Sequence, residues 1–107
     1  MRALILAAGY GSRLKPITNL IPKCMIHIND TPIIEIWIRK LINLGFKEIY
    51  INTHYKQDVV IDHIRKLKNL INFVKFFKED KLLGTAGTII NNYNNLCDQD
   101  LLLPHCD

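Results

Sequence analysis

The segment from Leu6 to Lys23 combines two glycines and two cations in a way that suits the binding of a polyphosphate. Gly9 and Gly11 come after a short apolar segment, where glycine permits positive φ angles and lets a ligand approach the main chain closely. Successive N–H groups in such a turn converge on anionic oxygens. Arg13 adds a planar fork of donors, and Lys23 adds a mobile point charge. For the glycines alone, an ordinary turn between a strand and a helix is the alternative interpretation.

Two common glycine motifs are absent from this segment. A Walker-type P-loop requires Gly-Lys followed by Ser or Thr, which does not occur here. A dinucleotide fingerprint requires Gly or Ala three residues after its second glycine, and Leu14 occupies that position. The glycines therefore support neither a P-loop ATPase nor a dehydrogenase.

The elements that must position this segment alternate along the chain. Short apolar segments with β-branched or aromatic residues predict strands at 2–6, 48–52, 72–77 and 101–103. Apolar residues at helical spacing predict helices at 33–44, 57–67 and 85–93, and Gly45 is expected to end the first as a left-handed cap. This alternation predicts an α/β fold with a parallel sheet. Ligands of such sheets bind at the carboxyl ends of the strands, where all the polar motifs fall.

Composition and charge exclude several classes of protein. A charged fraction of 22% and a hydrophobic fraction of 49% indicate a folded globular domain rather than a disordered chain. The net charge of +4 comes from cations scattered along the helices, which favours solvated faces over a nucleic-acid surface. No apolar run is long enough to cross a membrane. Three cysteines without zinc-site spacing, and no secretory leader, predict a reducing, cytoplasmic setting.

Several histidines and the tryptophan have structural interpretations. His54 ends the second predicted strand and is expected to have a structural role rather than to transfer a proton. His27 and His63 are expected at the surface. His105 is two residues from Asp107 and lines either the site or the core. Trp37 is expected to pack between the first helix and the sheet.

The glycine segment and the residues after it resemble the signature of the sugar-1-phosphate nucleotidyltransferases. That signature reads Ala-Gly-x-Gly-x-Arg-Leu, then Pro-x-Thr, Pro-Lys and Pro-Ile/Leu-Ile, and this chain matches it at residues 8–14, 16–18, 22–23 and 32–34. Residues 79–87 (EDKLLGTAG) resemble a segment of the mannose-1-phosphate guanylyltransferases, and residues 101–107 (LLLPHCD) resemble a strand that ends in a metal-binding Asp. Cys24 and Asp30 depart from the pattern at positions without a catalytic assignment.

The resemblance covers the whole chain and implies a fold and an activity. The implied fold is a Rossmann-like three-layer αβα arrangement with a mostly parallel sheet, the amino-terminal half of a GT-A-like nucleotidyltransferase. Residues 1–107 are then one nucleotide-binding domain that stops short of the family's full length. The implied reaction joins a nucleoside triphosphate, with GTP favoured, to a sugar 1-phosphate and releases pyrophosphate. These two small molecules are the expected partners, without nucleic acid or membrane, and a homo-oligomer is an open alternative.

The resemblance also assigns roles to individual residues. Arg13 and Lys23 are the implied catalytic residues, which neutralise the phosphates, and Asp107 is the implied ligand of Mg²⁺. The carboxylate of Glu79, five residues before Gly84, is expected to accept from two donors of guanine, and a solvated glutamate in the charged run 78–81 is the alternative interpretation. The residues implied to bind the nucleotide are Leu6, Ala7, Ala8, Gly9, Gly11, Ser12, Arg13, Glu79, Gly84 and Thr85.

Two alternatives to this function stay open at the level of sequence. The family takes a second metal-binding aspartate from well beyond the first, so the chain is expected to be inactive alone, either as a silent fragment or as a regulatory nucleotide-binding module. The other alternative is a transferase of the same superfamily that uses another nucleotide or a non-hexose phosphate. Neither the sugar nor the pathway can be read from these residues.

Overall fold

A computed structural model describes residues 2–9, 21–81, 84–92 and 101–104 of the chain. Every predicted strand and helix is present, with boundaries that differ by at most two residues from the prediction. Short 3₁₀ turns occur at Lys23–Met25 and Ile71–Phe73. The longer elements, in chain order, are β1 (Arg2–Leu6), β2 (His27–Ile28), β3 (Thr31–Pro32), α1 (Ile33–Asn43), β4 (Ile49–Thr53), α2 (Gln57–Arg65), β5 (Val74–Lys78), α3 (Gly84–Asn91) and β6 (Leu101–Leu102).

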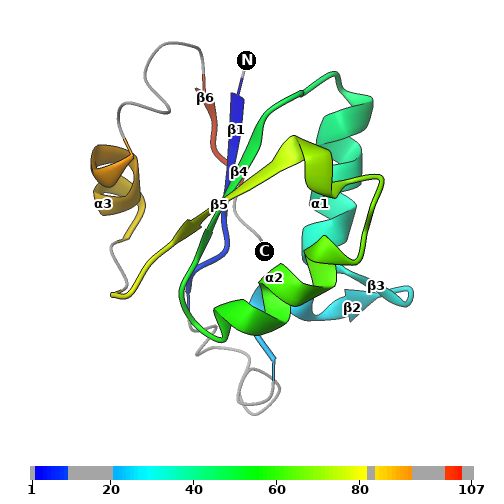
Figure 1. The fold of residues 1–107 in the computed structure, drawn as a ribbon, viewed down its shortest axis with the longest axis horizontal. Coiled ribbons are helices and arrows are strands. Elements are labelled where there is room, and N and C mark those ends of the chain that lie inside the picture. Colours follow the sequence, from blue (N-terminus) through cyan, green and yellow to red (C-terminus); the bar gives the residue numbers. More distant parts are fainter. Residues whose placement is uncertain (1, 10–20, 82–83, 93–100, 105–107) are drawn as a thin grey trace.

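The central sheet has the strand order β5-β4-β1-β6, and all three pairings are parallel. Figure 1 shows β1 and β4 in the middle of the molecule, with β5 and β6 on either side of them. The register places Leu6 beside Asn52 and Asn52 beside Phe77. The last residues of β1, β4 and β5 therefore meet at one edge, as the parallel-sheet prediction requires.

Helices cover both faces of this sheet, which confirms the three-layer αβα arrangement (Figure 1). On one face, Ile5 and Ile51 pack with Ile38 of α1 and Ile64 of α2 in a fully buried cluster. On the opposite face, a smaller cluster forms around Leu4 and Tyr50, and partly buried Ile89 of α3 packs against it. The alternation of side chains along each strand explains this division, because successive residues point to opposite faces.

Helix α1 follows its predicted apolar stripe and ends at the predicted glycine. Ile34, Ile38 and Leu41 are buried, and partly buried Trp37 packs against the same core, as expected. Gly45 has a φ of +96°, and the next residue, Phe46, donates its N–H to the carbonyl of Leu41 at 3.0 Å. Gly45 N–H donates to Ile42 O at 3.0 Å, so the two bonds form a Schellman motif.

A two-residue turn joins β2 to β3 before α1 begins. Asn29 and Asp30 have φ values of 51° and 66°, which is the left-handed pair that a type I′ turn requires. Asp30 departs from the glycine of the family pattern, but aspartate tolerates the left-handed region better than most residues. The departure therefore leaves the hairpin intact.

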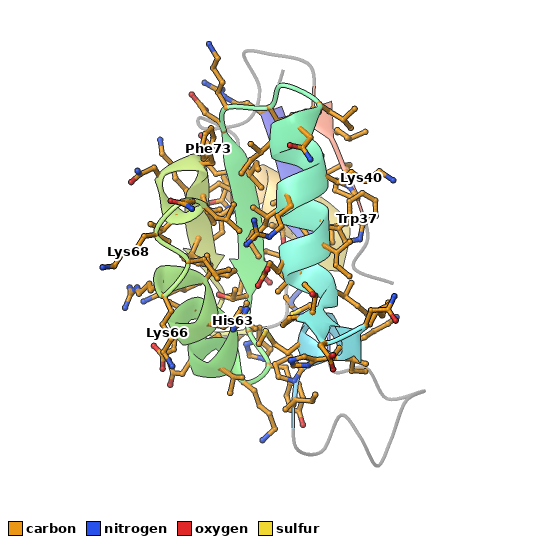
Figure 2. The ribbon with its side chains drawn as sticks, turned by 90° about the vertical axis from the view of Figure 1, so that its right-hand side faces the viewer. Trp37, Lys40, His63, Lys66, Lys68 and Phe73 are labelled. Carbon is orange, nitrogen blue, oxygen red and sulfur yellow. The ribbon has the colours of Figure 1, made fainter. Side chains whose placement is uncertain are left out.

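The exposed side of α1 and α2 carries dispersed cations. Figure 2 shows Lys40 on one side of this face and Lys66 and Lys68 on the other, beyond α2. All three side chains are exposed. This arrangement agrees with the expectation of solvated cations. None of the helices in the described ranges has the length and apolar character needed to cross a bilayer.

Strand β5 begins later than the sequence predicts. Residues 72 and 73 belong to a 3₁₀ turn, in which Phe73 N–H donates to Leu70 O at 3.0 Å, and the strand starts at Val74. The apolar residues before Val74 contribute to the core from this turn instead, since Ile71 and Phe73 pack against the larger cluster. A short apolar run does not distinguish the two conformations.

Candidate functional site

The carboxyl ends of β1, β4 and β5 bring several of the predicted site residues together. Ala7 follows β1 and Glu79 follows β5, while Asn52 lies in β4 between them. Glu79 N–H donates to Thr53 O at 2.7 Å, which continues the parallel pairing by one residue beyond β5. This edge of the sheet is therefore ordered by main-chain bonds up to the start of each loop.

The Asn52 side chain joins these loops through both ends of its amide. Its Oδ1 accepts from the N–H of Ala7 at 2.7 Å. Its Nδ2 donates to Oε2 of Glu79 at 3.4 Å and to Oγ1 of Thr88 at 3.3 Å. Asn52 is only 4% exposed, so these partners replace the water that the amide would otherwise bind.

Glu79 is a buried carboxylate at the same edge. The residue is 4% exposed, and its Oε2 also accepts from the hydroxyl of Thr88, which is fully buried on α3. The main-chain oxygen of Glu79 lies 2.7 Å from Nδ1 of His54. His54 thus has the structural role expected of it. Within the described part of the chain, every buried polar side-chain atom has a hydrogen-bond partner.

The main chain after β1 leaves two donors at this edge. Ala8 O accepts from Tyr55 N–H at 3.5 Å. Among the described residues, no hydrogen bond engages the N–H of Ala8 or of Gly9. A methyl group added at Gly9 would meet no atom of the described residues within 4 Å, so none of them fills the space beside its Cα. Ala8 is only 3% exposed, so Gly9 is the residue at which an anion can approach this part of the main chain.

Gly9 and Gly84 differ in their backbone conformation. Gly9 is exposed, but the described residues with positive φ do not include it. Close approach of a ligand to Gly9 stays a prediction. Gly84 behaves differently, because its φ of +75° is a conformation that side chains rarely adopt. Gly84 begins α3 and is exposed, and no atom of the described residues lies within 4 Å of where a Cβ would be.

The remaining predicted site residues have different positions relative to this edge. Leu6 ends β1, and its N–H donates to Pro104 O at 3.0 Å. Lys23 is half-buried at the start of the 3₁₀ turn Lys23–Met25. Thr85 lies in α3, where only its main chain is described. The predicted residues outside the described ranges are Gly11, Ser12, Arg13 and Asp107.

Two residues of this edge were not expected from the sequence. Asn52 was placed at the end of a strand and Thr88 inside a helix, but neither was assigned a role. The signal for Asn52 is a polar residue directly after the apolar run Ile49–Ile51 of the strand. Thr88 gives a similar signal, as a polar residue on the inner side of a short helix. Such residues need a buried partner, which only the fold can supply.

Glu48, a carboxyl group with a lowered pKa, lies away from this edge. Hydrogen bonds from Tyr50 and Arg2 lower the pKa of Glu48, which immediately precedes β4 at the amino end of the sheet. Arg2 Nε lies 2.7 Å from Oε2 of Glu48, so this pair joins β1 to the start of β4. Among the described residues, no three His, Cys, Asp or Glu side chains group together as a metal site would require.

Comparisons with known proteins identify relatives of the whole chain. The sequence pattern of the family described as nucleotidyl transferase matches residues 2–105. The mannose-1-phosphate guanyltransferase of Yarrowia lipolytica is 33% identical over 101 residues, covering 94% of this chain and 28% of that protein. The corresponding enzyme of Saccharomyces cerevisiae is 33% identical over 90 residues, covering 83% of this chain and 25% of its own. The chain thus spans about a quarter of these curated relatives.

Solved structures give the same result for the fold. HddC from Yersinia pseudotuberculosis, solved with GMP-PN, superimposes with a TM-score of 0.85 at 33% identity, covering 99% of this chain and 47% of HddC. The CTP:phosphocholine cytidylyltransferase of Streptococcus pneumoniae gives a TM-score of 0.81 at 27% identity, covering 99% and 44% of the two chains. The described architecture therefore corresponds to somewhat less than half of each of these chains.

Proposed function

Because the chain belongs to the nucleotidyl transferase family, whose members are enzymes, we propose that it forms the nucleotide-binding part of a sugar-1-phosphate nucleotidyltransferase. The observation that carries this proposal is the main chain at Ala8 and Gly9, which becomes exposed at Gly9. Two main-chain N–H groups there have no partner among the described residues, and a ligand can approach the Cα of Gly9. A triphosphate offers oxygen acceptors for such donors.

The proposed reaction is an in-line displacement at phosphorus. An oxygen of the sugar 1-phosphate attacks the α-phosphorus of the triphosphate, the bond to the β-phosphate oxygen breaks, and pyrophosphate leaves. The attacking phosphate is already ionised near neutral pH, so no general base is required. Repulsion between two polyanions is the main obstacle, and catalysis consists of positioning and charge neutralisation. We assign the neutralisation to Arg13 and Lys23, and the positioning to the main chain at Ala8 to Ser12.

Asp107 is the one residue that we propose as a ligand of a divalent cation. A carboxylate and phosphate oxygens are the hard ligands that Mg²⁺ prefers, and the bound ion would stabilise negative charge on the phosphates. The described residues supply no cluster that could replace Asp107. Cytoplasm is the proposed compartment, and the buried free thiol of Cys24 is compatible with its reducing conditions.

Guanine is the proposed base, and mannose 1-phosphate is the proposed acceptor. The names of the curated relatives and the GMP-PN complex of HddC support this choice. Direct recognition of guanine by Glu79 stays a prediction. Its Oε2 already accepts from Asn52 and Thr88, so a base contact would have to share the carboxylate with these two side chains.

Calorimetry with GTP, UTP, dTTP and CTP tests the nucleotide and the base together. We expect binding of GTP to be the tightest of the four. A preference for UTP or dTTP would contradict the guanine proposal, and failure to bind any of the four would contradict nucleotide binding itself. A parallel assay of pyrophosphate release with GTP, Mg²⁺ and mannose 1-phosphate tests the reaction.

A nucleotide-binding module without turnover is the second proposed function. The chain covers only 44–47% of the two solved nucleotidyltransferases compared above, so more than half of each of those chains has no counterpart in these 107 residues. Nucleotide binding without pyrophosphate release would favour this second function. Release at about 1 s⁻¹ or faster, as ordinary enzymes achieve, would favour the first.

A further inference from the structure

We infer that Asn52, Glu79 and Thr88 act as one positioning unit, which holds the main chain after β1 in the shape that presents Ala8 and Gly9. The inference rests on the proposed function in one respect, which is that the ligand is a nucleotide. The unit does not need to touch the nucleotide. It acts through the Ala7 N–H, which Asn52 Oδ1 holds at 2.7 Å.

The orientation of the Asn52 amide is determined by its partners. On one side it meets an N–H group, from Ala7, and on the other it meets the Glu79 carboxylate and the Thr88 hydroxyl oxygen. A reversed amide would place its NH₂ group against the Ala7 N–H and its carbonyl against the carboxylate. Only one orientation satisfies all three contacts. Glu79 and Thr88 therefore keep Oδ1 directed at Ala7.

This bond changes the role of Ala7 in the proposed site. Its N–H is engaged by Asn52, and the residue is only 8% exposed. Ala7 is thus the anchor of the loop rather than one of its phosphate donors. The next two amides, of Ala8 and Gly9, have no partner among the described residues, and Gly9 is the first exposed residue of this loop.

The same unit joins this loop to α3. Thr88 lies one turn after the helix start at Gly84, and its hydroxyl donates to Glu79 while accepting from Asn52. A buried carboxylate requires such donors, because an unpaired buried charge is costly. The loop after β1 and the start of α3 are consequently held in one fixed relationship. In the proposed function, these are the segments that meet the phosphates and the nucleoside.

Amide hydrogen exchange at Ala7 tests the unit directly in the 107-residue chain. We expect Asn52→Ala to accelerate exchange at Ala7 by about tenfold or more, since the bond that protects the amide is lost. Thr88→Val keeps the shape of the side chain and should accelerate exchange by a smaller factor. Thr31→Val makes the same chemical change in the β2–β3 hairpin and should leave Ala7 unaffected. Circular dichroism shows whether a variant is unfolded. If Asn52→Ala unfolds the chain, exchange at Ala7 in Thr88→Val decides whether the unit protects this amide.

A reciprocal exchange of the amide and the carboxylate gives a sharper test. Asn52→Asp alone places two buried carboxylates against each other. Of these variants, it should accelerate amide hydrogen exchange at Ala7 the most. Adding Glu79→Gln restores one carboxylate and one amide in swapped positions. The carboxylate oxygens introduced at position 52 can then accept from Ala7, from Thr88 and from the new amide. We expect the double variant to recover Ala7 protection to within about threefold of the unmodified chain. A double variant no better than Asn52→Asp would overturn the inference.

Nucleotide titrations separate positioning from base recognition. If the unit only positions the main chain, Thr88→Val and Glu79→Gln should each weaken the binding of GTP and the binding of UTP by the same factor. A loss confined to GTP would assign Glu79 to the base and overturn its role through Asn52. If the unmodified chain binds no nucleotide, the proposed function fails, while exchange at Ala7 still decides whether the unit exists.

Discussion

Glu35 and His63 link the two helices on one face of the sheet, with 3.1 Å between Oε1 of Glu35 and Nε2 of His63. The other carboxylate oxygen accepts from Arg39 Nε at 2.9 Å. Burial acts to raise the pKa of Glu35, but hydrogen bonds from Arg39 and His63, together with their charges, outweigh it and lower the pKa below its ordinary value of 4.5. His63 is therefore a half-buried helix contact and not the surface residue expected from the sequence.

This link predicts a pH-dependent stability. A carboxyl group with a lowered pKa in the folded state stabilises the fold above its unfolded pKa, and this stabilisation is lost as the pH falls through the folded pKa. We expect Glu35→Gln to cost about 1 kcal/mol at pH 7, the scale of a typical net hydrogen bond. Between pH 7 and pH 3, the free energy of unfolding measured with urea should then decline less for Glu35→Gln than for the unmodified chain.

Asp62→Asn provides a matched control on the exposed side of α2. It should reproduce the pH dependence of the unmodified chain. If the curves of Glu35→Gln and the unmodified chain run parallel down to pH 3, the proposed link between α1 and α2 contributes no pH dependence and the prediction is wrong.

The phosphate assignments predict large kinetic effects wherever this chain is part of an active enzyme. Arg13→Ala and Lys23→Ala should each lower kcat/KM by about a hundredfold or more, the scale of removing one preorganised charge. Lys40→Ala removes an exposed cation of α1 and should have no such effect. Turnover of Arg13→Ala within about a factor of two of the unmodified enzyme would contradict its assignment.

The face covered by α3 predicts self-association of the 107-residue chain. Ile90 is 74% exposed on that helix, and Leu102 is 41% exposed on β6, the outermost strand on that side of the described sheet. Exposed strand edges and apolar patches favour association. We expect light scattering to detect oligomers, and Leu102→Lys to shift the distribution toward monomer.

Leu44→Lys is the control, because Leu44 is 66% exposed at the end of α1 and away from this face. It should leave the oligomer distribution unchanged. A monodisperse monomer for the unmodified chain at high micromolar concentration would refute self-association.

The end of α1 predicts a simple backbone effect. Gly45→Ala should destabilise the fold by about 1 kcal/mol, because the φ of +96° lies in a region that alanine disfavours. A Cβ at this position would meet no atom of the described chain within 4 Å, so we attribute the effect to the backbone. Thermal unfolding measures it, with Leu44→Ala as the neighbouring control. Equal midpoints for Gly45→Ala and the unmodified chain would contradict the predicted strain.

The layer structure could be predicted because it depends on local periodicity. Ile34, Ile38 and Leu41 recur at helical spacing and are buried as predicted. The apolar segment of β1 occupies the predicted residues, and Gly45 ends α1 as expected. The start of β5 could not be predicted in the same way, since residues 71–73 are compatible with either a strand or a 3₁₀ turn.

For the candidate site too, the local features could be predicted and the long-range contacts could not. The sequence alone determined that glycine-rich main chain and the cations of the family signature come after the first strand, because these residues are close together in the chain. Only the tertiary structure decided that Asn52 anchors Ala7 and that Glu79 is buried between Asn52 and Thr88. These partners are separated by 45, 27 and 9 residues along the chain. Hydrogen bonds of a buried side chain depend on which atoms the fold brings within about 3 Å, and no local pattern specifies that distance.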